Sequence, residues 1–270
     1  MSDLMTLLAG AVTIVKEAGG IILEHSQKPR DIHHKGRIDL VTATDVIVEN
    51  FLRDRLGTLL PGSHFLAEES SPKVGLKENT WVIDPIDGTT NFAHGLPFVG
   101  TSVGLWRDGH IVLCIVNAPL LNSCFTAVQG KGAFCDGRRL AVSQTSDLVN
   151  SLVATGFPYS MENELPGLLR RMGRVLEQTQ GVRRYGAASL DLAFVASGQY
   201  DGYYERCLHP WDVAAGWLLV TEAGGCVTRL DGSPYFLHSH DIVATNGKIH
   251  AALQGLMYTE EDNVVETYQS

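Results

Sequence analysis

The chain has no C-x-x-C pair, no dense cluster of basic residues and no uninterrupted apolar run long enough to cross a membrane. Its five cysteines are odd in number and widely spaced, which favours a reducing, cytoplasmic location. The 30 acidic residues outnumber 21 basic ones, giving a formal net charge of −9. Because phosphate backbones require clustered lysine and arginine, sequence-independent binding to nucleic acid is not expected.

The remaining composition is that of an ordinary globular protein. With 270 residues, 44% of them hydrophobic, the chain is long enough to bury a large core. We expect effectively one compact unit of two closely packed parts, an N-terminal α+β lobe over residues 1–146 and a C-terminal α/β lobe over residues 147–270. An acidic protein can still bind an anionic substrate if metal ions supply positive charge locally.

Hydrophobic spacing predicts a mixture of helices and strands. Apolar residues recur at helical spacing from Leu4 to His25, and a second helix is expected after Thr44. Its buried side is expected to carry Val46, Ile47, Phe51 and Leu52. From residue 101 onward, β-rich runs predict an antiparallel meander with a hairpin turn at residues 136 and 137. Helices in "ASLDLAFVASG" and "PWDVAAGWLLVTEAGG" flank a predicted strand, "YDGYYE". The pattern indicates an α+β fold with two sheets.

Acidic residues gather at the ends of predicted strands and at the starts of predicted helices. They occur in four segments, "DLVTATD", "AEES", "DPIDGTT" and "WDVAAG", which contribute Asp39, Asp45, Glu68, Glu69, Asp84, Asp87 and Asp212. Sites made only of oxygen ligands suit hard cations such as Mg²⁺. The four segments together therefore predict a magnesium site.

The segment "WVIDPIDGTTNF" has the geometry that such a site needs. Two aspartates placed three residues apart repel each other unless a cation shares them. Pro85 stiffens the turn expected there, and the carbonyl of Ile86 can face inward as a further oxygen ligand. If a helix begins at Gly88, the amides of Gly88 and of the two following threonines would form a seat for an anion.

Each of these segments also has a plain structural interpretation. A single D-x-x-D is usually a solvated turn or a helix cap. Asp212 alone is more often an acid at a helix N-terminus, where the helix dipole stabilises it. Glu68 and Glu69 could simply be exposed. The joint occurrence of all four segments favours the metal site over these alternatives.

Two longer strings carry a resemblance to a known family. "WVIDPIDGTTNFAHGLPF" resembles the first signature of the inositol monophosphatase family, and "WDVAAGWLLVTEAGG" is similar to the second. "DLVTATD", "AEES" and "GKGAFCDG" match in the same order, so the resemblance extends from about Leu4 to Leu256. It implies a layered αβαβα sandwich, a homodimer, and Mg²⁺-dependent, lithium-sensitive hydrolysis of phosphate monoesters, with inositol monophosphate as the substrate.

The resemblance also implies roles for individual residues. Two or three Mg²⁺ ions per site would be held by Glu68, Asp84, the Ile86 carbonyl, Asp87 and Asp212. Thr89, hydrogen-bonded to Asp45, would help Glu68 to orient the attacking water. The phosphate and the hydroxyl groups of a small phosphorylated polyol or sugar would be bound by Asp87, Gly88, Thr89, Ala188 and Glu205.

The residues themselves favour direct attack by water. No serine or cysteine lies in a recognisable nucleophile elbow, so a phosphoenzyme is not expected. Other substrates stay open, namely fructose 1,6-bisphosphate, for which Arg183 or Arg184 could reach a second phosphate, histidinol phosphate, and 3′-phosphoadenosine 5′-phosphate. A non-catalytic regulatory binding protein with the same fold is the alternative from a different class.

Overall fold

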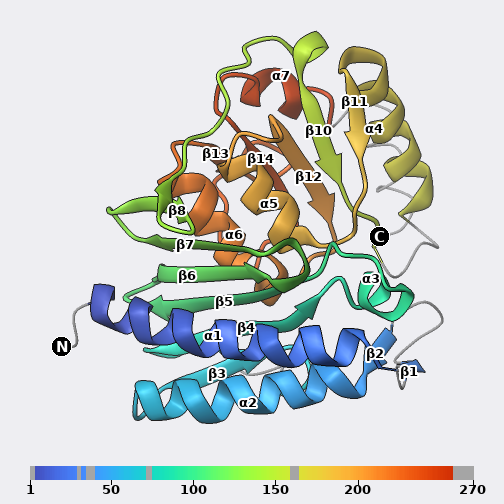
Figure 1. Ribbon diagram of the computed structural model, residues 1–270. Coiled ribbons are helices and arrows are strands. Elements are labelled where there is room, and N and C mark those ends of the chain that lie inside the picture. The colour runs from blue at the N-terminus through green and yellow to red at the C-terminus, as the bar shows by residue number, and fades with distance from the viewer. Residues whose placement is uncertain (1–3, 29–31, 35–39, 71–74, 159–163, 258–270) are drawn as a thin grey trace.

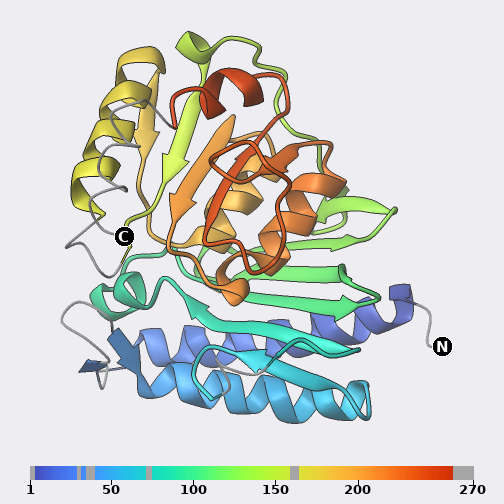
Figure 2. The same cartoon turned by 180° about the vertical axis from the view of Figure 1, so that it is seen from behind.

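The computed structural model describes residues 4–28, 32–34, 40–70, 75–158 and 164–257, and for 32–34, 40 and 41 it describes the backbone only. Five layers follow one another, as Figure 1 and the reverse view in Figure 2 show. Helices α1 and α2 cover a seven-stranded sheet, helices α5 and α6 fill the middle, and a five-stranded sheet with α4 and α7 completes the stack. The predicted α+β fold with αβαβα layers is confirmed.

The seven-stranded sheet has the order β3-β4-β5-β6-β7-β8-β9. Its strands are β3 (His64–Ala67), β4 (Thr80–Asp87), β5 (Gly100–Arg107), β6 (His110–Ala118), β7 (Ser123–Val128), β8 (Gly132–Cys135) and β9 (Arg138–Arg139). Only β3 and β4 are parallel, and the rest form the predicted antiparallel meander. The turn between β8 and β9 has positive φ at Asp136 and Gly137, as a tight hairpin requires.

The five-stranded sheet has the order β11-β10-β12-β14-β13. Its strands are β10 (Leu152–Thr155), β11 (Gly181–Arg183), β12 (Gly202–Arg206), β13 (Cys226–Thr228) and β14 (Asp241–Thr245). Strand β10 runs parallel to β11 and β12, whereas β14 is antiparallel to β12 and β13. The sequence analysis did not predict β10, β11 and β13, because three or four residues carry too little alternation to be recognised. A separate pair, β1 (Ile32–His34) and β2 (Leu40–Thr42), precedes α2.

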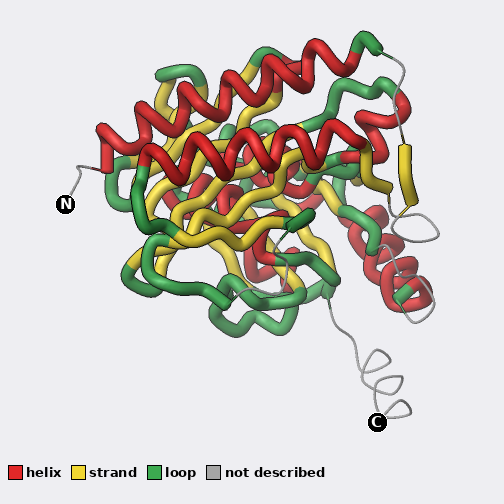
Figure 3. The backbone as a smooth tube through the Cα atoms, turned by 90° about the horizontal axis from the view of Figure 1, so that it is seen from below, coloured by secondary structure: helices red, strands yellow, loops and turns green. Residues whose placement is uncertain are grey.

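Helix α1 (Leu4–Ser26) is long and apolar enough, by length and composition alone, to cross a membrane. In the structure it lies beside α2 (Ala43–Leu59) on the outer face of the seven-stranded sheet, as Figure 3 shows from below. One side of α1, from Leu7 through Val15 to Ile22, is buried in the core formed with that sheet. This packing accounts for the apolar composition of the helix.

The predicted buried side of α2 is wrong in part. Val46 and Ile47 are exposed, and the buried apolar residues are Val48, Leu52 and Leu56. These three follow one another at intervals of four residues and form the stripe that faces the sheet. Because several adjacent residues at the start of the helix are apolar, the sequence alone did not show which of them face the sheet.

The two middle helices are α5 (Ala188–Ala196) and α6 (Pro210–Glu222). Almost every residue of both is buried, because they contact sheets on both sides. The outer helices α4 (Leu165–Gln178) and α7 (His250–Gln254) cover the far face of the five-stranded sheet. The short helix α3 (Thr89–His94) follows β4 directly. This arrangement brings the end of β4 close to the middle layer.

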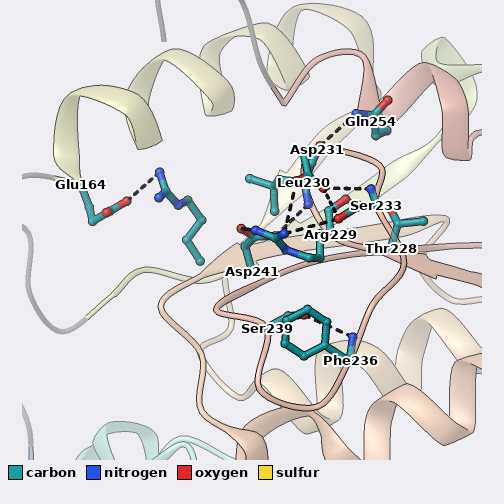
Figure 4. Close-up of polar contacts among 11 residues, drawn as sticks. Glu164, Thr228, Arg229, Leu230, Asp231, Ser233, Phe236, Ser239, Asp241 and Gln254 are labelled. Carbon is teal, nitrogen blue, oxygen red and sulfur yellow. Dashed lines mark hydrogen bonds and ion pairs between the residues drawn. The ribbon is translucent and has the colours of Figure 1, made fainter. Parts of the chain in front are cut away.

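A polar cluster holds the connection between β13 and β14, as Figure 4 shows. Arg229 forms ion pairs with Asp231 and Asp241, at N–O distances of 3.3 and 3.8 Å. Asp241 also accepts a hydrogen bond from the Leu230 amide, and the Leu230 carbonyl accepts one from Gln254. The acids in this part of the molecule are therefore paired with a cation or with amides and have a structural role.

Candidate active site

The two aspartates of the "DPID" segment lie within strand β4 and not in a turn, which corrects the local prediction. All eight residues of β4 are buried, and the pairing with β5 is irregular between Asp84 and Asp87. Pro85 causes this irregularity because it has no amide hydrogen to donate to the neighbouring strand. Its carbonyl accepts a hydrogen bond of 3.0 Å from Thr101 on β5, which keeps the distorted segment in the sheet.

The candidate residues meet in one cleft between the two sheets. Its lining includes Glu68, Asp84, Ile86, Asp87, Gly88, Thr89, Glu205 and Asp212. An adjoining cavity shares four of these residues and adds Ala188. Figure 1 shows β4 and β12 ending on the side of the molecule where α3 lies. Of the residues given a role, only Asp45 is behind the cleft wall. Asp39, the other acid of the first segment, lies outside the described residues.

Asp84 is the most deeply buried of the cleft acids. Only 3% of its surface is exposed, and its Oδ1 atom has no hydrogen-bond partner among the described residues. Burial raises the pKa of this carboxyl well above its ordinary value, and the charges of Glu68, Asp87 and Asp212 raise it further. A buried carboxylate with an unsatisfied oxygen is costly, so the site has a strong preference for a positively charged ligand.

Asp87 is held by the N-terminus of α5. Its Oδ2 atom accepts hydrogen bonds from the amide of Ser189, at 2.7 Å, and from the Ser189 hydroxyl. The amides of Ala188 and Leu190 also favour the charged form. Burial nevertheless outweighs these contacts and raises the pKa of Asp87 to about 6. Ala188, for which the resemblance implies a substrate contact, is the first residue of the same helix and lines the adjoining cavity.

Asp45 and Thr89 form a link behind the cleft. Asp45 caps α2, accepting hydrogen bonds from the Thr42 amide and hydroxyl through Oδ2. Its Oδ1 atom lies 3.1 Å from the Thr89 hydroxyl, which also lies 2.9 Å from the Ile86 carbonyl. The contact between Thr89 and Asp45 that the resemblance implies is therefore present. With the hydroxyl hydrogen directed at either acceptor, the Thr89 oxygen can accept a hydrogen bond from a water molecule in the cleft.

Glu68 follows β3 and is positioned by an acid that the sequence analysis did not consider. The carboxylate of Glu49, on α2, accepts hydrogen bonds from the amides of Glu69 and Ser70, at 2.8 and 3.0 Å. Glu49 itself is 1% exposed, and the two amides that it binds are partly buried at the start of the turn. It fixes the turn that carries Glu68 at the end of its strand.

Asp212 lies in the first turn of α6. Its Oδ2 atom accepts a hydrogen bond of 2.7 Å from the His209 amide, which completes a capping box. The interpretation of Asp212 as an acid at a helix N-terminus is therefore correct. Burial nonetheless raises the pKa of Asp212 well above its ordinary value, and repulsion from Glu68, Asp87 and Glu205 adds to the shift. Asp212 therefore caps its helix and also faces the other cleft acids.

Gly88 connects β4 to α3 in a conformation that other residues rarely adopt. Its φ is +88°, and a Cβ atom there would lie 2.8 Å from the Phe98 carbonyl oxygen. The side chain of Asn91, within α3, donates hydrogen bonds to the carbonyls of Phe98 and Tyr185. Asn91 thus ties the predicted phosphate seat to the segment that leads into α5.

Glu205 lies at the end of β12 on the opposite side of the cleft. Burial raises its pKa to about 7, against the effects of a hydrogen bond from Tyr203 and the charge of Arg184. Arg184 borders the same cavity and stacks on Phe157, with its guanidinium carbon 4.8 Å from the ring centroid. It is the only lysine or arginine among the described residues that line the cavity.

The donor set fits a hard divalent cation. Among the described residues, no lysine or arginine forms an ion pair with Asp84, Asp87 or Asp212, in contrast to the acids around Arg229. No group of three or more acidic, histidine or cysteine side chains in the described part is already positioned to hold a metal. The charges of Glu68, Asp87 and Asp212 raise the pKa of Asp84, and a cation would satisfy its unpaired Oδ1 atom.

Three further residues of the site were not found from the sequence. Ser189 binds Asp87, and Glu49 anchors the Glu68 turn. Asp191 is fully buried in α5, and in the described part of the chain neither of its carboxylate oxygens has a partner. Burial, with Glu205 and Asp87 nearby, raises the pKa of Asp191 well above its ordinary value. The position of Asp191 within the apolar run "ASLDLAFVA" could have indicated it from the sequence, whereas no local pattern distinguishes Ser189 or Glu49.

Comparison with known proteins identifies the family of this chain. Residues 3–262 match the model of the inositol monophosphatase family. Inositol-1-monophosphatase of Synechocystis sp. is 42% identical over 93% of this chain and 88% of its own length. Nus factor SuhB of Salmonella typhimurium is 37% identical over 94% of this chain and 96% of its own. The crystal structure of the extragenic suppressor protein suhB from Bartonella henselae has a TM-score of 0.88, with 33% identity, covering 95% of this chain and 99% of that one.

The fold is of the layered αβαβα type, and family membership supports a phosphatase. The chain belongs to the inositol monophosphatase family.

Proposed function

We propose that the protein is a Mg²⁺-dependent phosphate-monoester hydrolase that acts on inositol monophosphate. The observation that carries this proposal is the buried, orphaned carboxylate oxygen of Asp84, facing three further acids in a cleft. The family and the name of the Synechocystis relative support the choice of reaction and of substrate. The homodimer, the cytoplasmic location and the lithium sensitivity stay predictions.

The cation sites use the residues named from the sequence. Glu68, Asp84, the Ile86 carbonyl, Asp87 and Asp212 would hold two or three Mg²⁺ ions. When bound, these ions neutralise phosphoryl charge and make water more acidic. Glu68 and the Thr89 hydroxyl orient the attacking water, and the Thr89 hydroxyl is itself held by Asp45. Amides of Gly88 and Thr89 receive the phosphate oxygens, and Glu205 accepts hydrogen bonds from hydroxyls of the alcohol part.

The test is magnesium-dependent release of phosphate from inositol 1-phosphate. Replacing Asp84 with asparagine should lower kcat/KM by about 10³-fold or more, because the change removes one charge from the centre of the acid cluster. Asp231→Asn is the matched control, since Asp231 pairs with Arg229 and does not line the cleft, and it should stay within about twofold of wild type. Wild-type turnover in Asp84→Asn would refute the proposal.

Direct attack by water has a separate test. In a single turnover of phosphorus-32-labelled substrate stopped with acid, the label should appear in inorganic phosphate and not on the protein, because no serine or cysteine lies in a recognisable nucleophile elbow. A labelled phosphoryl group trapped on a protein side chain would indicate a phosphoenzyme and refute direct attack.

Fructose 1,6-bisphosphate is the second candidate, and Arg184 is the observation that favours it. A guanidinium at the cavity edge can bind a second phosphate on the alcohol part. Glu205 in the same cavity repels such a group, so we rank the monophosphate first. Turnover of inositol 1-phosphate, fructose 1,6-bisphosphate, histidinol phosphate and 3′-phosphoadenosine 5′-phosphate at one concentration would rank the substrates.

A regulatory role without catalysis is the alternative from another class, and one relative is named a Nus factor. Burying four acids against one another costs stability unless they bind something, which favours a working site. Absence of phosphate release with Mg²⁺ and all four substrates would favour the regulatory alternative.

A further inference from the structure

The carboxylate of Glu205 is held from two sides by residues that have no role in the proposal above. Tyr203 and Glu205 are two positions apart on β12, so their side chains leave the same face of the strand. The Tyr203 hydroxyl donates a hydrogen bond to Oε2 of Glu205. Tyr203 is completely buried, and the pKa of its hydroxyl is raised well above the ordinary value by burial and then by the charge of Glu205. The hydroxyl therefore stays a donor.

Gly156 lies against the other side of the same carboxylate. It follows β10, which runs parallel to β12 with Thr155 opposite Tyr204, so Gly156 is next to Glu205 in the sheet. A Cβ atom at position 156 would lie 2.0 Å from Oε2 and 2.2 Å from Oε1 of Glu205. No side chain can share this space with the carboxylate in its present position. Glycine at 156 is thus a condition for the observed orientation of Glu205.

These contacts leave one oxygen of Glu205 available. Among the described residues, Oε2 receives the Tyr203 hydrogen bond, whereas Oε1 receives none. Glu205 lines both parts of the cleft together with Asp87, Gly88 and Asp212. A carboxylate that served only as a partner for Tyr203 would carry a large desolvation cost for a single hydrogen bond. Because Glu205 lines the cleft, its unpaired oxygen suits a hydroxyl group of a ligand.

We infer that Tyr203 and Gly156 are positioning residues that determine the preference for polyol esters, because together they fix Glu205 with one oxygen free to accept a substrate hydroxyl. The inference rests on the proposed function and concerns the alcohol part of the substrate, not the phosphate. A fixed acceptor discriminates strongly, since an ester without the hydroxyl leaves the acceptor unpaired. A mobile carboxylate loses that discrimination because it must be ordered at each binding event.

The experiment compares kcat/KM for inositol 1-phosphate with kcat/KM for p-nitrophenyl phosphate, whose alcohol part has no hydroxyl groups. Tyr203→Phe removes only the hydroxyl that holds Oε2. Gly156→Ala displaces the carboxylate without removing a charge, and the flexible end of Glu205 can move at little cost in stability. Each variant should lower the ratio of the two kcat/KM values about tenfold, mainly through a higher KM for the polyol ester.

Two controls match these variants. Tyr204→Phe removes the hydroxyl of the adjacent tyrosine, which packs with Val153 and Val175 away from the cleft. Gly173→Ala adds a methyl group where no atom of the described residues lies within 4 Å. Both should keep the wild-type ratio. In a Glu205→Gln background, Tyr203→Phe should have a much smaller further effect on the ratio, because residues that act through one contact are not additive.

Three results would overturn the inference. A parallel fall for both substrates in Tyr203→Phe and Gly156→Ala would show a general structural effect, and an unchanged ratio would show that neither residue positions Glu205 for binding. In both cases the proposed function would stand, since wild type would still prefer the polyol ester. A wild-type enzyme without that preference would overturn the inference and the proposed substrate together.

Discussion

Replacing Asp87 with asparagine should stabilise the metal-free protein while weakening the binding of magnesium. Asparagine has nearly the same shape, and its amide oxygen can still accept the hydrogen bonds of Ser189. The negative charge is lost. The variant therefore separates the free-energy cost of burying the Asp87 carboxylate from the contribution of that carboxylate to magnesium binding.

The magnitude follows from the pKa of Asp87, which burial raises from 3.8 to about 6. One pKa unit corresponds to about 1.4 kcal/mol, so the ionised carboxylate costs the folded, metal-free protein about 3 kcal/mol. Because the pKa is higher in the folded state than in the unfolded state, the cost is absent below the unfolded pKa. It develops as the pH rises from about 4 to 6 and is complete above pH 7.

Urea denaturation in EDTA, at pH 5 and pH 8, measures this effect. Asp87→Asn should be more stable than wild type by about 3 kcal/mol at pH 8 and by about half as much at pH 5. Saturating Mg²⁺ should stabilise wild type more than the variant, because a ligand stabilises only the state that binds it. Asp231→Asn is the control of opposite sign, because hydrogen bonds from Ser233 and the charge of Arg229 lower the pKa of Asp231.

Two results would refute this reasoning. One is an Asp87→Asn variant that is less stable than wild type at pH 8 in EDTA. The other is a stability difference that is the same at both pH values, which would show that the ionisation of Asp87 is not its source.

Two further predictions concern the segment between β4 and α3. Thr89→Val keeps the shape of the side chain but removes the hydroxyl, so it should lower kcat for phosphate release about 10- to 100-fold. Thr89→Ser keeps the hydroxyl and should keep most activity. Equal rates in both variants would contradict a role for the hydroxyl. Gly88→Ala should lower the free energy of unfolding by about 1–3 kcal/mol in urea, because φ is +88° and the new Cβ would meet the Phe98 carbonyl. Gly75→Ala, where no described atom lies within 4 Å of the new Cβ, should have little effect, and similar losses in both variants would contradict the steric argument.

The acids of the cleft could be predicted from the sequence because each follows a recognisable element boundary. Glu68 comes after β3, Asp84 and Asp87 close β4, and Asp212 is in the first turn of α6. Side chains at the ends of elements that meet at one edge are brought together by the fold itself. The placement of these acids therefore depended on local patterns and on the two long strings that resemble the family.

The supporting residues could not be predicted because their partners are distant in the chain. Ser189 acts on Asp87 across 102 positions, and Glu49 acts on the Glu69 amide across 20. Neither residue type is unusual in its own helix, so no local pattern distinguishes it. The exposure of Val46 and Ile47 has the same origin, since only packing against the sheet determines the phase of a helix with many apolar residues.

The cleft takes its walls from three separate layers, with β4 in one sheet, α5 and α6 in the middle and β12 in the other sheet. No single layer carries a complete set of acids. A small displacement of one layer relative to the next would leave every helix and strand intact, but it would move the acids away from their positions around the cleft. Heat or denaturant should for this reason abolish turnover before circular dichroism records any loss of secondary structure.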